Sequence, residues 1–249
     1  METTSMNKSS SVPPSTNFGN QPTSSMSNVQ KIKQYLKRFI HLKQMDWQQP
    51  IINMIYLMYK PSAVFKESKR RMLIKQQYAR DDPAFVLLLA WYFLIIGYAY
   101  AISFQSGILH HLKFMLILVI VHYIGLGLLI STLAWTWTNY WMNTQSSRHV
   151  VEWLYAFDVH INSFFTFFIY VYLIQYLLLP ILLRDNLLSL AAGNLLYAIG
   201  FSSYFYVSFR GYLEIDSLSK PKVFLYPIIP ICLISIVATI LRFSLVQFV

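Results

Sequence analysis

Residues Val151 to Asn162 read VEWLYAFDVHIN, and they run into Ile161 to Leu183, a stretch without a charged side chain. The hydrocarbon core of a bilayer is about 30 Å thick and a helix rises about 1.5 Å per residue, so a span needs roughly 20 apolar residues. The uncharged stretch is long enough to cross a membrane. Two acids and a histidine therefore lie at the edge of an apolar span, which indicates a membrane protein.

The rest of the chain has the same character. Of its 249 residues, 56% are hydrophobic, 17% are aromatic and 12% are charged, and this charged share is about half that of a globular protein. We predict an all-α membrane protein with five transmembrane helices. The predicted spans are Phe85 to Phe104, Phe114 to Trp137, Ile161 to Leu183, Leu187 to Phe209 and Val223 to Leu241.

Lys and Arg are distributed unevenly around these spans. Thirteen of the 20 basic residues precede the first span, and Arg210, Lys220 and Lys222 follow the fourth. The positive-inside rule then places the N-terminus and Arg148 in the cytosol, with seventeen basic residues on that side and three on the other. The C-terminus is predicted to be lumenal.

Two regions precede the transmembrane domain, which we assign to residues 85–249. Residues 1–28 are rich in Ser, Thr, Asn and Pro, and we expect them to be disordered because few apolar residues offset the entropy of ordering. Residues 29–84 are predicted to form a basic amphipathic cytosolic or interfacial region. Apolar residues recur there at helical spacing, and the basic residues among them are predicted to bind the membrane surface: Lys31, Lys33, Lys37, Arg38 and Lys43.

The alternative for this amphipathic helix is packing on the cytosolic face of the protein itself. Beyond it, Ile51 to Tyr59 is apolar but too short to cross a bilayer, so we predict an interfacial or re-entrant segment. A second basic cluster, Lys66 to Lys75, comes shortly before the first span. Nucleic-acid binding is another interpretation of so much positive charge, but the sequence contains no recognised nucleic-acid motif.

Tyr78 to Phe85 read YARDDPAF, which is typical of a helix start. Asp82 is predicted to accept hydrogen bonds at the N-cap, with Pro83 at the first helical position. The functional alternative is a docking surface for a cytosolic partner, formed by Arg80, Asp81 and Asp82.

In VEWLYAFDVHIN, residues four apart share a helix face, so Asp158 is expected beside Asn162 and Trp153 beside Phe157. Asp158 and His160 point in nearly opposite directions on one helix, which argues against a shared metal site.

Glu152 and Asp158 are expected at the cytosolic interface, either solvated or paired with Arg148 or Arg210. Two interpretations remain open for them. They form an interhelical polar network, or they are offered to a partner by a cytosolic loop from Asn139 to His160.

The sequence contains no GxSxG elbow, P-loop or HExxH motif, so we predict no enzyme activity, no cofactor and no metal. A rival function is a small transporter or lipid-modifying enzyme. It would use the polar groups His122, Asp158, His160 and Asn194.

Five stretches together resemble the uncoordinated-50 family of Golgi and endoplasmic reticulum membrane proteins. They are KQMDW at Lys43, YARDDPAF at Tyr78, GLGLLISTLAW at Gly125, VEWLYAFDVHIN at Val151 and the segment from Gly193 to Pro227. The resemblance covers about Lys43 to Pro230 in consistent order. The tail before Val29 matches no pattern of the family.

The resemblance implies five spans, a cytosolic N-terminus and residence in the Golgi. It also implies a role in delivering multisubunit receptors to the cell surface, together with guanine-nucleotide exchange factors for Arf GTPases, and RNA binding has been proposed for some relatives. It defines no catalytic site. Its motif positions are expected to have interaction or structural roles: Arg80, Asp81, Asp82, Pro83, Glu152, Trp153, Tyr155, Phe157, Asp158, His160, Asn162, Gly193 and Asn194.

Overall fold

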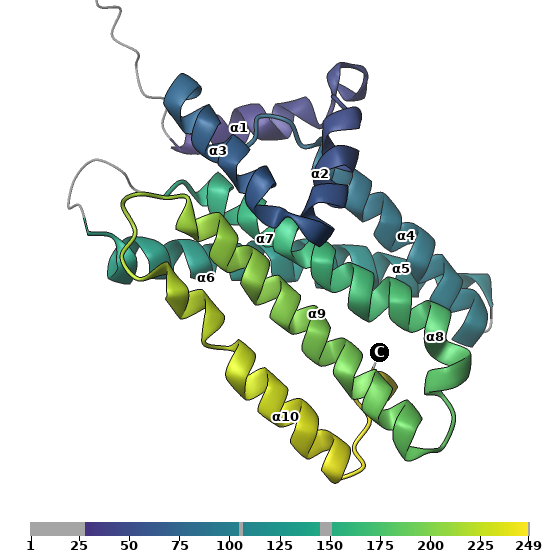
Figure 1. Cartoon of the computed structure of the whole chain (residues 1–249). Helices are drawn as coiled ribbons and strands as arrows, with labels where there is room; N and C mark the ends of the chain where they lie inside the picture. The colour runs from purple at the N-terminus through teal and green to yellow at the C-terminus, as the bar shows by residue number, and fades with distance from the viewer. Residues whose placement is uncertain (1–27, 105–106, 145–150, 249) are drawn as a thin grey trace, which may run out of the picture.

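The computed structural model describes residues 28–104, 107–144 and 151–248 (Figure 1). This part of the chain is α-helical; it contains no strand and one isolated antiparallel bridge, between Asn143 and Leu218. The all-α prediction is therefore confirmed. The prediction of disorder for the N-terminal tail falls almost wholly outside the described residues.

Five continuous helices are long and apolar enough to cross a membrane, as predicted. They are Ala84–Phe104, Ile108–Met142, Trp153–Leu182, Leu187–Leu213 and Pro221–Ile240. Their α-helical parts are α4 (Ala84–Phe104), α5 (Ile108–Ile117), α6 (Leu126–Trp137), α7 (Trp153–Phe168), α8 (Gln175–Leu182), α9 (Leu187–Leu213) and α10 (Ile228–Ile240). Wider π-helical turns join α5 to α6 at Leu118–Gly125 and α7 to α8 at Ile169–Ile174.

Several helices extend beyond the spans predicted for them, most of all the second and the third. The second helix extends beyond Trp137 through a further π-helical segment, Thr138–Met142, and the third begins at Trp153 instead of Ile161. The predicted loop from Asn139 to His160 is therefore largely helical where the structure describes it. The start of the third helix was placed too late because charge was taken to end a helix, whereas Asp158 and His160 lie inside α7, where other segments of the chain supply their partners.

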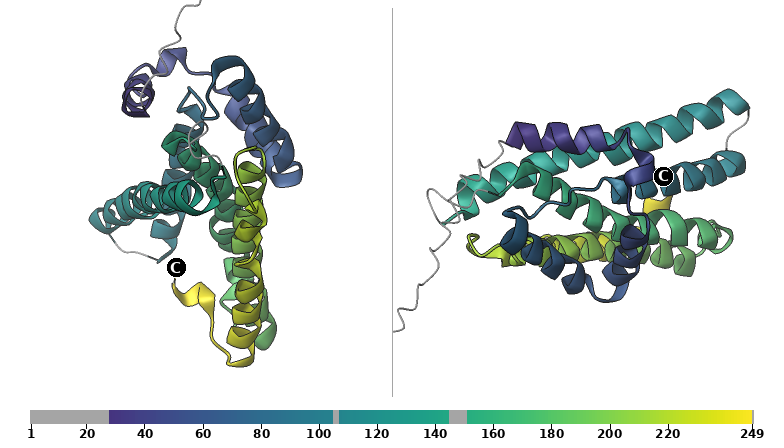
Figure 2. Two further views of the ribbon diagram at one scale, coloured as in Figure 1. Left: turned by 90° about the vertical axis from the view of Figure 1, so that its left-hand side faces the viewer. Right: turned by 90° about the horizontal axis from the view of Figure 1, so that it is seen from above.

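The helix α7 lies at the centre of the bundle, between α6 and α9, and α10 packs on the far side of α9. Figure 2 shows the pair α5 and α6 projecting away from the pair α9 and α10. The core is aromatic: the Phe93 ring of α4 stacks with Tyr123 and with Phe164, and its centroid lies 4.6 Å from that of Phe168. Large buried rings of this kind supply much of the packing area of the bundle.

The close packing of α7 and α9 depends on glycine. A Cβ atom built on Gly211 would lie 2.8 Å from Val159, and one on Gly200 would lie 2.6 Å from Val171. Without hydrophobic exclusion to drive helix association inside a membrane, this close approach supplies the van der Waals contact that does so.

The N-terminal helices lie across one end of the bundle (Figure 1). These are α1 (Asn28–Arg38), α2 (Gln48–Tyr59) and α3 (Pro61–Lys75); together with their connections we call residues 29–75 the basic arm. A single residue, Lys60, separates α2 from α3, so the two form a tight helical hairpin, and Pro61 begins α3 because a first-turn residue needs no N–H partner. The hairpin contacts α4, α7 and α9, and neither of its helices is among the five that are long and apolar enough to cross a membrane. An interfacial or re-entrant position for Ile51 to Tyr59 stays a prediction.

Candidate functional site

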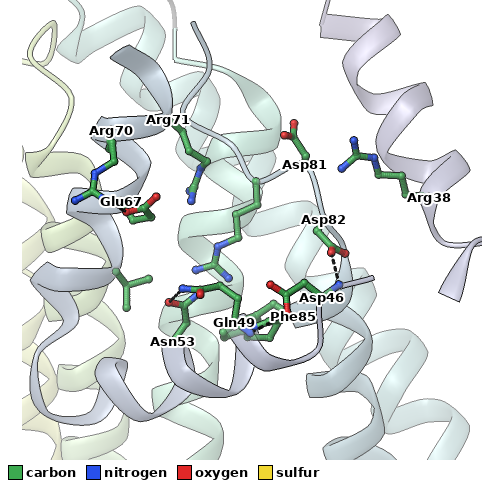
Figure 3. A pocket seen from close by; sticks show the side chains of 13 residues that line it. Arg38, Asp46, Gln49, Asn53, Glu67, Arg70, Arg71, Asp81, Asp82 and Phe85 are labelled. Carbon is green, nitrogen blue, oxygen red and sulfur yellow. Dashed lines mark hydrogen bonds and ion pairs between the residues drawn. The ribbon is translucent and has the colours of Figure 1, made fainter. Parts of the chain in front are cut away.

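A polar pocket of about 540 Å³ lies between the basic arm and the bundle (Figure 3). Its walls come from α1, α2, α3, the segment that joins α3 to α4, and the first turn of α4. The lining includes four arginines, four acids and two amides: Arg38, Arg70, Arg71, Arg80, Asp46, Glu67, Asp81, Asp82, Gln49 and Asn53. Successive parts of one stretch, residues 38–85, therefore fold together around one charged site.

Asp158 connects this pocket to the bundle. Its carboxylate lies 3.4 Å from Nε of Arg80 and 3.8 Å from a terminal nitrogen of Arg71. Arg80 also donates a 2.8 Å hydrogen bond to Oδ1 of Asn162, and the Asn162 amide donates to the Asp158 carboxylate. All three charged side chains are at least four-fifths buried. A carboxylate this buried is tolerated because two cations compensate it.

The two arginines are fixed by further contacts. Arg71 donates to Oγ of Ser68 and to the carbonyl oxygen of Tyr78. Burial lowers the pKa of Arg71, and the charge of Asp158 works in the opposite direction. The guanidinium of Arg80 lies 4.8 Å from the centre of the Phe85 ring, which is a cation–π distance.

Asp82 has the capping role predicted for it. Its Oδ1 accepts from the backbone N–H of Ala84 at the start of α4, while Oδ2 accepts from the backbone N–H of Asp46. Asp46 in turn accepts from the N–H groups of Gln48 and Gln49 in the first turn of α2. One pair of acids thus joins the beginnings of α2 and α4 and neutralises part of the helix dipoles there.

Asp81 points to the other side of the same segment, where it pairs with Lys75 at 2.6 Å and accepts from the Gln77 amide. Burial alone would raise its pKa, but the hydrogen bond and charge of Lys75, aided by Gln77, outweigh burial, and the pKa of Asp81 is lowered. Asp81 is therefore ionised throughout the physiological range.

Glu152 connects the arm to the bundle a second time. Its carboxylate lies 2.5 Å from Nζ of Lys31 in α1, and its other oxygen accepts from the backbone N–H of Ala79. The side chain of Glu152 is 12% exposed and that of Lys31 is 20% exposed. Lys31 was predicted to bind the membrane surface, and in the structure it binds the protein instead.

The structure also corrects how Glu152 and Asp158 are paired. Within the described residues their partners are Lys31, Arg71 and Arg80, and the predicted Arg210 is not among them. The other predicted partner, Arg148, lies outside the described residues. Neither carboxylate is displayed to a partner by a loop. The structure thus supports the interpretation of an interhelical polar network for these two acids.

The aromatic residues of the same motif face neighbouring helices. Trp153 donates to Thr132 of α6 and stacks on Phe157 with centroids 5.6 Å apart, as the four-residue spacing predicts. Tyr155 is fully buried and donates to the carbonyl oxygen of Gly211 in α9. These contacts fix the position of α7 between its neighbours.

His160 faces away from Asp158, as predicted, and its Nδ1 lies 2.8 Å from the hydroxyl of Tyr204. It borders a separate, largely apolar cavity of about 430 Å³, which His122 also lines. Asp158 and Asn194 do not line this cavity. The structure therefore does not bring together the four polar groups that a transporter or enzyme was expected to use.

Gly193 and Asn194 lie near the opposite end of α9 from the arm. Asn194 is fully buried; its amide donates to Oγ1 of Thr239 and to the Phe243 carbonyl, and its oxygen accepts from the N–H of Leu245. A Cβ atom on Gly193 would lie 2.5 Å from Val246. These two motif residues fasten the C-terminal segment to α9.

Sequence reasoning did not assign several residues of the charged pocket. Arg71 was seen only as part of a basic cluster, and Gln49, Asn53 and Glu67 were not singled out. One signal was present for Arg71: an acid inside an apolar helix, as at Asp158, requires a buried cation from elsewhere. The remaining predicted surface residues are exposed: Lys33, Lys37, Arg38 and Lys43.

No group of three or more His, Cys, Asp or Glu side chains that could hold a metal occurs within the described parts of the chain. The single cysteine, Cys232, is exposed on α10.

The five apolar helices and the charged arm across one end define the class: a helical, multi-pass membrane protein. The family model described as UNC-50 family matches residues 35–249. The chain is 43% identical to the protein unc-50 homolog of Dictyostelium discoideum over 202 residues, 79% of this chain and 77% of that protein. It is 34% identical to the human protein unc-50 homolog over 202 residues, 80% of this chain and 78% of that protein. The chain therefore belongs to the UNC-50 family.

A third relative, protein unc-50 of Caenorhabditis elegans, is 38% identical over 210 residues, which is 82% of this chain and 67% of that protein. No solved structure matches this chain.

Proposed function

We propose that this protein is a membrane trafficking adaptor of the Golgi or endoplasmic reticulum. In this proposal the basic arm faces the cytosol and works with guanine-nucleotide exchange factors for Arf GTPases, and the protein supports delivery of membrane cargo such as multisubunit receptors. The mechanism is recruitment, not chemistry. Family membership and the uneven distribution of basic residues both support this orientation and role.

One structural observation carries the proposal. Helix α1 is tied to α7 through Lys31 and Glu152, yet its outer surface exposes apolar and basic side chains together. On α1, Val29 is 74% exposed and Leu36 59%, and Lys33 and Lys37 are exposed beside them. Ile40, in the turn that follows α1, is 80% exposed. Apolar side chains that remain exposed on an anchored helix are typical of an interaction surface.

The experiment is affinity purification in mild detergent followed by mass spectrometry. The test variant carries Lys33→Glu and Lys37→Glu, which reverse the charge of the outer surface of α1 without touching an intrachain ion pair. The matched control carries Lys220→Glu and Lys222→Glu, two exposed residues in the connection between α9 and α10. We expect the test variant to lose Arf exchange factors from the eluate and the control to retain them.

Equal recovery of exchange factors with both variants and the unaltered chain would contradict the proposal. Cargo delivery is followed in parallel as the amount of a multisubunit receptor at the cell surface. The rival transporter or enzyme function predicts a different pattern: His122→Ala would abolish delivery while every partner is still recovered.

A further inference from the structure

The charged pocket contains arginine N–H groups that have no acceptor. Nε of Arg71 and both Nε and one terminal nitrogen of Arg80 are buried without a hydrogen-bond partner. Asp158 is near enough to form ion pairs with both side chains, but its geometry satisfies none of these three donors, and its own Oδ2 is also buried without a hydrogen-bond partner. A buried donor without an acceptor costs about 1–3 kcal/mol, so the arrangement favours a ligand that supplies acceptors.

The acids that line the pocket do not satisfy these donors, because each is engaged elsewhere. Asp46 and Asp82 accept from backbone N–H groups at the starts of α2 and α4. Asp81 pairs with Lys75, and Glu67 pairs with Arg70 at 3.2 Å. The four acids keep their negative charges and balance the four arginines of the lining, but none of them accepts a hydrogen bond from the three unpaired donors of Arg71 and Arg80.

Arg38 adds further donors from the opposite wall. It projects from α1 toward the pocket (Figure 3); its side chain forms no hydrogen bond or ion pair within the described part of the chain, although its charge helps to lower the pKa of Asp81. Its side chain is exposed. Arg38 can therefore turn toward a ligand without breaking an existing contact.

The donors and the amides together indicate the chemistry of that ligand. Guanidinium groups present paired N–H donors that match the oxygens of a phosphate. On the α2 wall, Gln49 donates to Asn53 at 3.3 Å, which leaves the Gln49 oxygen and the Asn53 nitrogen available to hydroxyl groups. The volume of about 540 Å³ lies in the range of small-molecule sites, so a ring bearing a phosphate has room.

The position of the pocket indicates that this ligand is part of a lipid. Phe85, in the first turn of the first span, forms one wall. The α2 helix that carries Gln49 and Asn53 exposes Ile51 and Ile55 on its surface. The pocket thus lies where charged and apolar surfaces meet, which is the level of the lipid phosphates in a bilayer. We propose that it binds the phosphorylated inositol headgroup of an anionic lipid.

The test measures binding of short-chain phosphatidylinositol monophosphate to the full-length protein in detergent. Short-chain phosphatidylinositol, phosphatidylserine and soluble inositol phosphate are compared under the same conditions. We expect the phosphorylated inositol lipid to bind at least about tenfold more tightly than phosphatidylinositol and phosphatidylserine, as one charge-assisted hydrogen bond supplies that much. We expect it to bind more tightly than soluble inositol phosphate because only the lipid has apolar chains to bury.

The variant Arg38→Gln removes one phosphate donor, and we expect it to weaken binding about tenfold. Lys33→Gln and Lys37→Gln are the matched controls, because they remove the same charge from the same helix outside the pocket. Gln49→Ala is a second test variant and removes a hydroxyl partner from an exposed position. It is expected to weaken binding of the inositol lipid without changing thermal stability.

Three results would overturn the proposal. Equal weakening by Arg38→Gln and by the two lysine variants would mean that a diffuse basic surface attracts any anionic lipid. If soluble inositol phosphate bound with equal affinity, the site would recognise a free phosphorylated inositol and not a lipid. If phosphatidylinositol bound with equal affinity, the site would not recognise the phosphate group on the inositol ring. The inference does not depend on exchange-factor recruitment, since binding is measured with the purified protein alone.

Discussion

The charged pocket beneath the arm and the Asn194 cluster near the other end of α9 are both polar groups inside an apolar bundle. At Asn194 one neutral side chain uses both amide hydrogens and its oxygen within the protein. In the pocket, Arg71 and Arg80 leave three buried donors without an acceptor although an acid lies beside them. The hydrogen-bonding groups of the Asn194 side chain all have partners, whereas those of Arg71 and Arg80 do not.

This difference separates a structural role from a binding role. A satisfied buried group stabilises the fold, and nothing further can be added to it. A partly satisfied group costs stability, and such a cost is usual where a ligand completes the network. The same family resemblance pointed to both places, yet only the hydrogen-bond partners distinguish them.

The largest expected effect comes from removing the acid between the two arginines. Asp158→Asn leaves two buried cations without a counter-charge, and we expect a loss of about 3 kcal/mol, or roughly 6–12 °C in Tm. The measurement is thermal unfolding of the purified protein in detergent.

The control for this variant is Asp216→Asn. Asp216 pairs with Lys69 at 2.7 Å, but its side chain is 77% exposed, so its loss should change Tm very little. If both variants behaved alike, the pocket network would not be part of the structural framework, and the contrast with Asn194 would lose its basis.

A smaller effect is expected at the Asn194 cluster. Asn194→Leu removes three hydrogen bonds, each worth about 0.6 kcal/mol inside a membrane, so we expect a loss of about 2 kcal/mol. Hydrogen exchange at the Leu245 amide should rise because its acceptor is gone. Thr239→Val removes only one of the three bonds and serves as the graded control. A full-sized effect from Thr239→Val would show that the cluster does not act through Asn194.

Local spacing accounts for what could be predicted. The five spans, the cap at Asp82 and the stacking of Trp153 on Phe157 all follow from residues within a few positions of one another. The pairing of Asp158 with Arg71 and Arg80 does not. It depends on how the α2 and α3 hairpin folds back on the bundle, and helical periodicity contains no information about that fold.

The start of α7 was misplaced for a related reason. Glu152 and Asp158 look like interface residues when no partner is visible, so the span was predicted to begin after them. Once Lys31 from the arm and Arg80 from the segment between α3 and α4 supply counter-charges, the same acids are compatible with a buried helix. A side chain that looks exposed from its own segment is therefore predicted wrongly when a distant segment of the chain covers it.

The link between Glu152 and Lys31 should be weaker than the Asp158 network, because Lys31 can reach solvent when its partner is lost. We expect Glu152→Gln to cost about 1 kcal/mol and to raise hydrogen exchange in α1 about fivefold. Exchange in α9 and α10 should not change. Lys33→Gln is the control on the same helix and should leave exchange in α1 unaltered. If hydrogen exchange in α1 did not rise after Glu152→Gln, contacts other than the ion pair with Lys31 would hold α1 in place.

The smallest effect concerns pH. Lys75 and Gln77 lower the pKa of Asp81 despite its partial burial. A carboxyl group whose pKa is lower in the folded state stabilises the fold above its unfolded pKa, which is about 3.9. That contribution is lost as the pH falls through the folded value. Asp81→Asn should therefore lower Tm slightly at pH 7 and by a smaller amount as the pH falls below about 3.9. An equal difference at both ends of this range would contradict the role of the ion pair with Lys75.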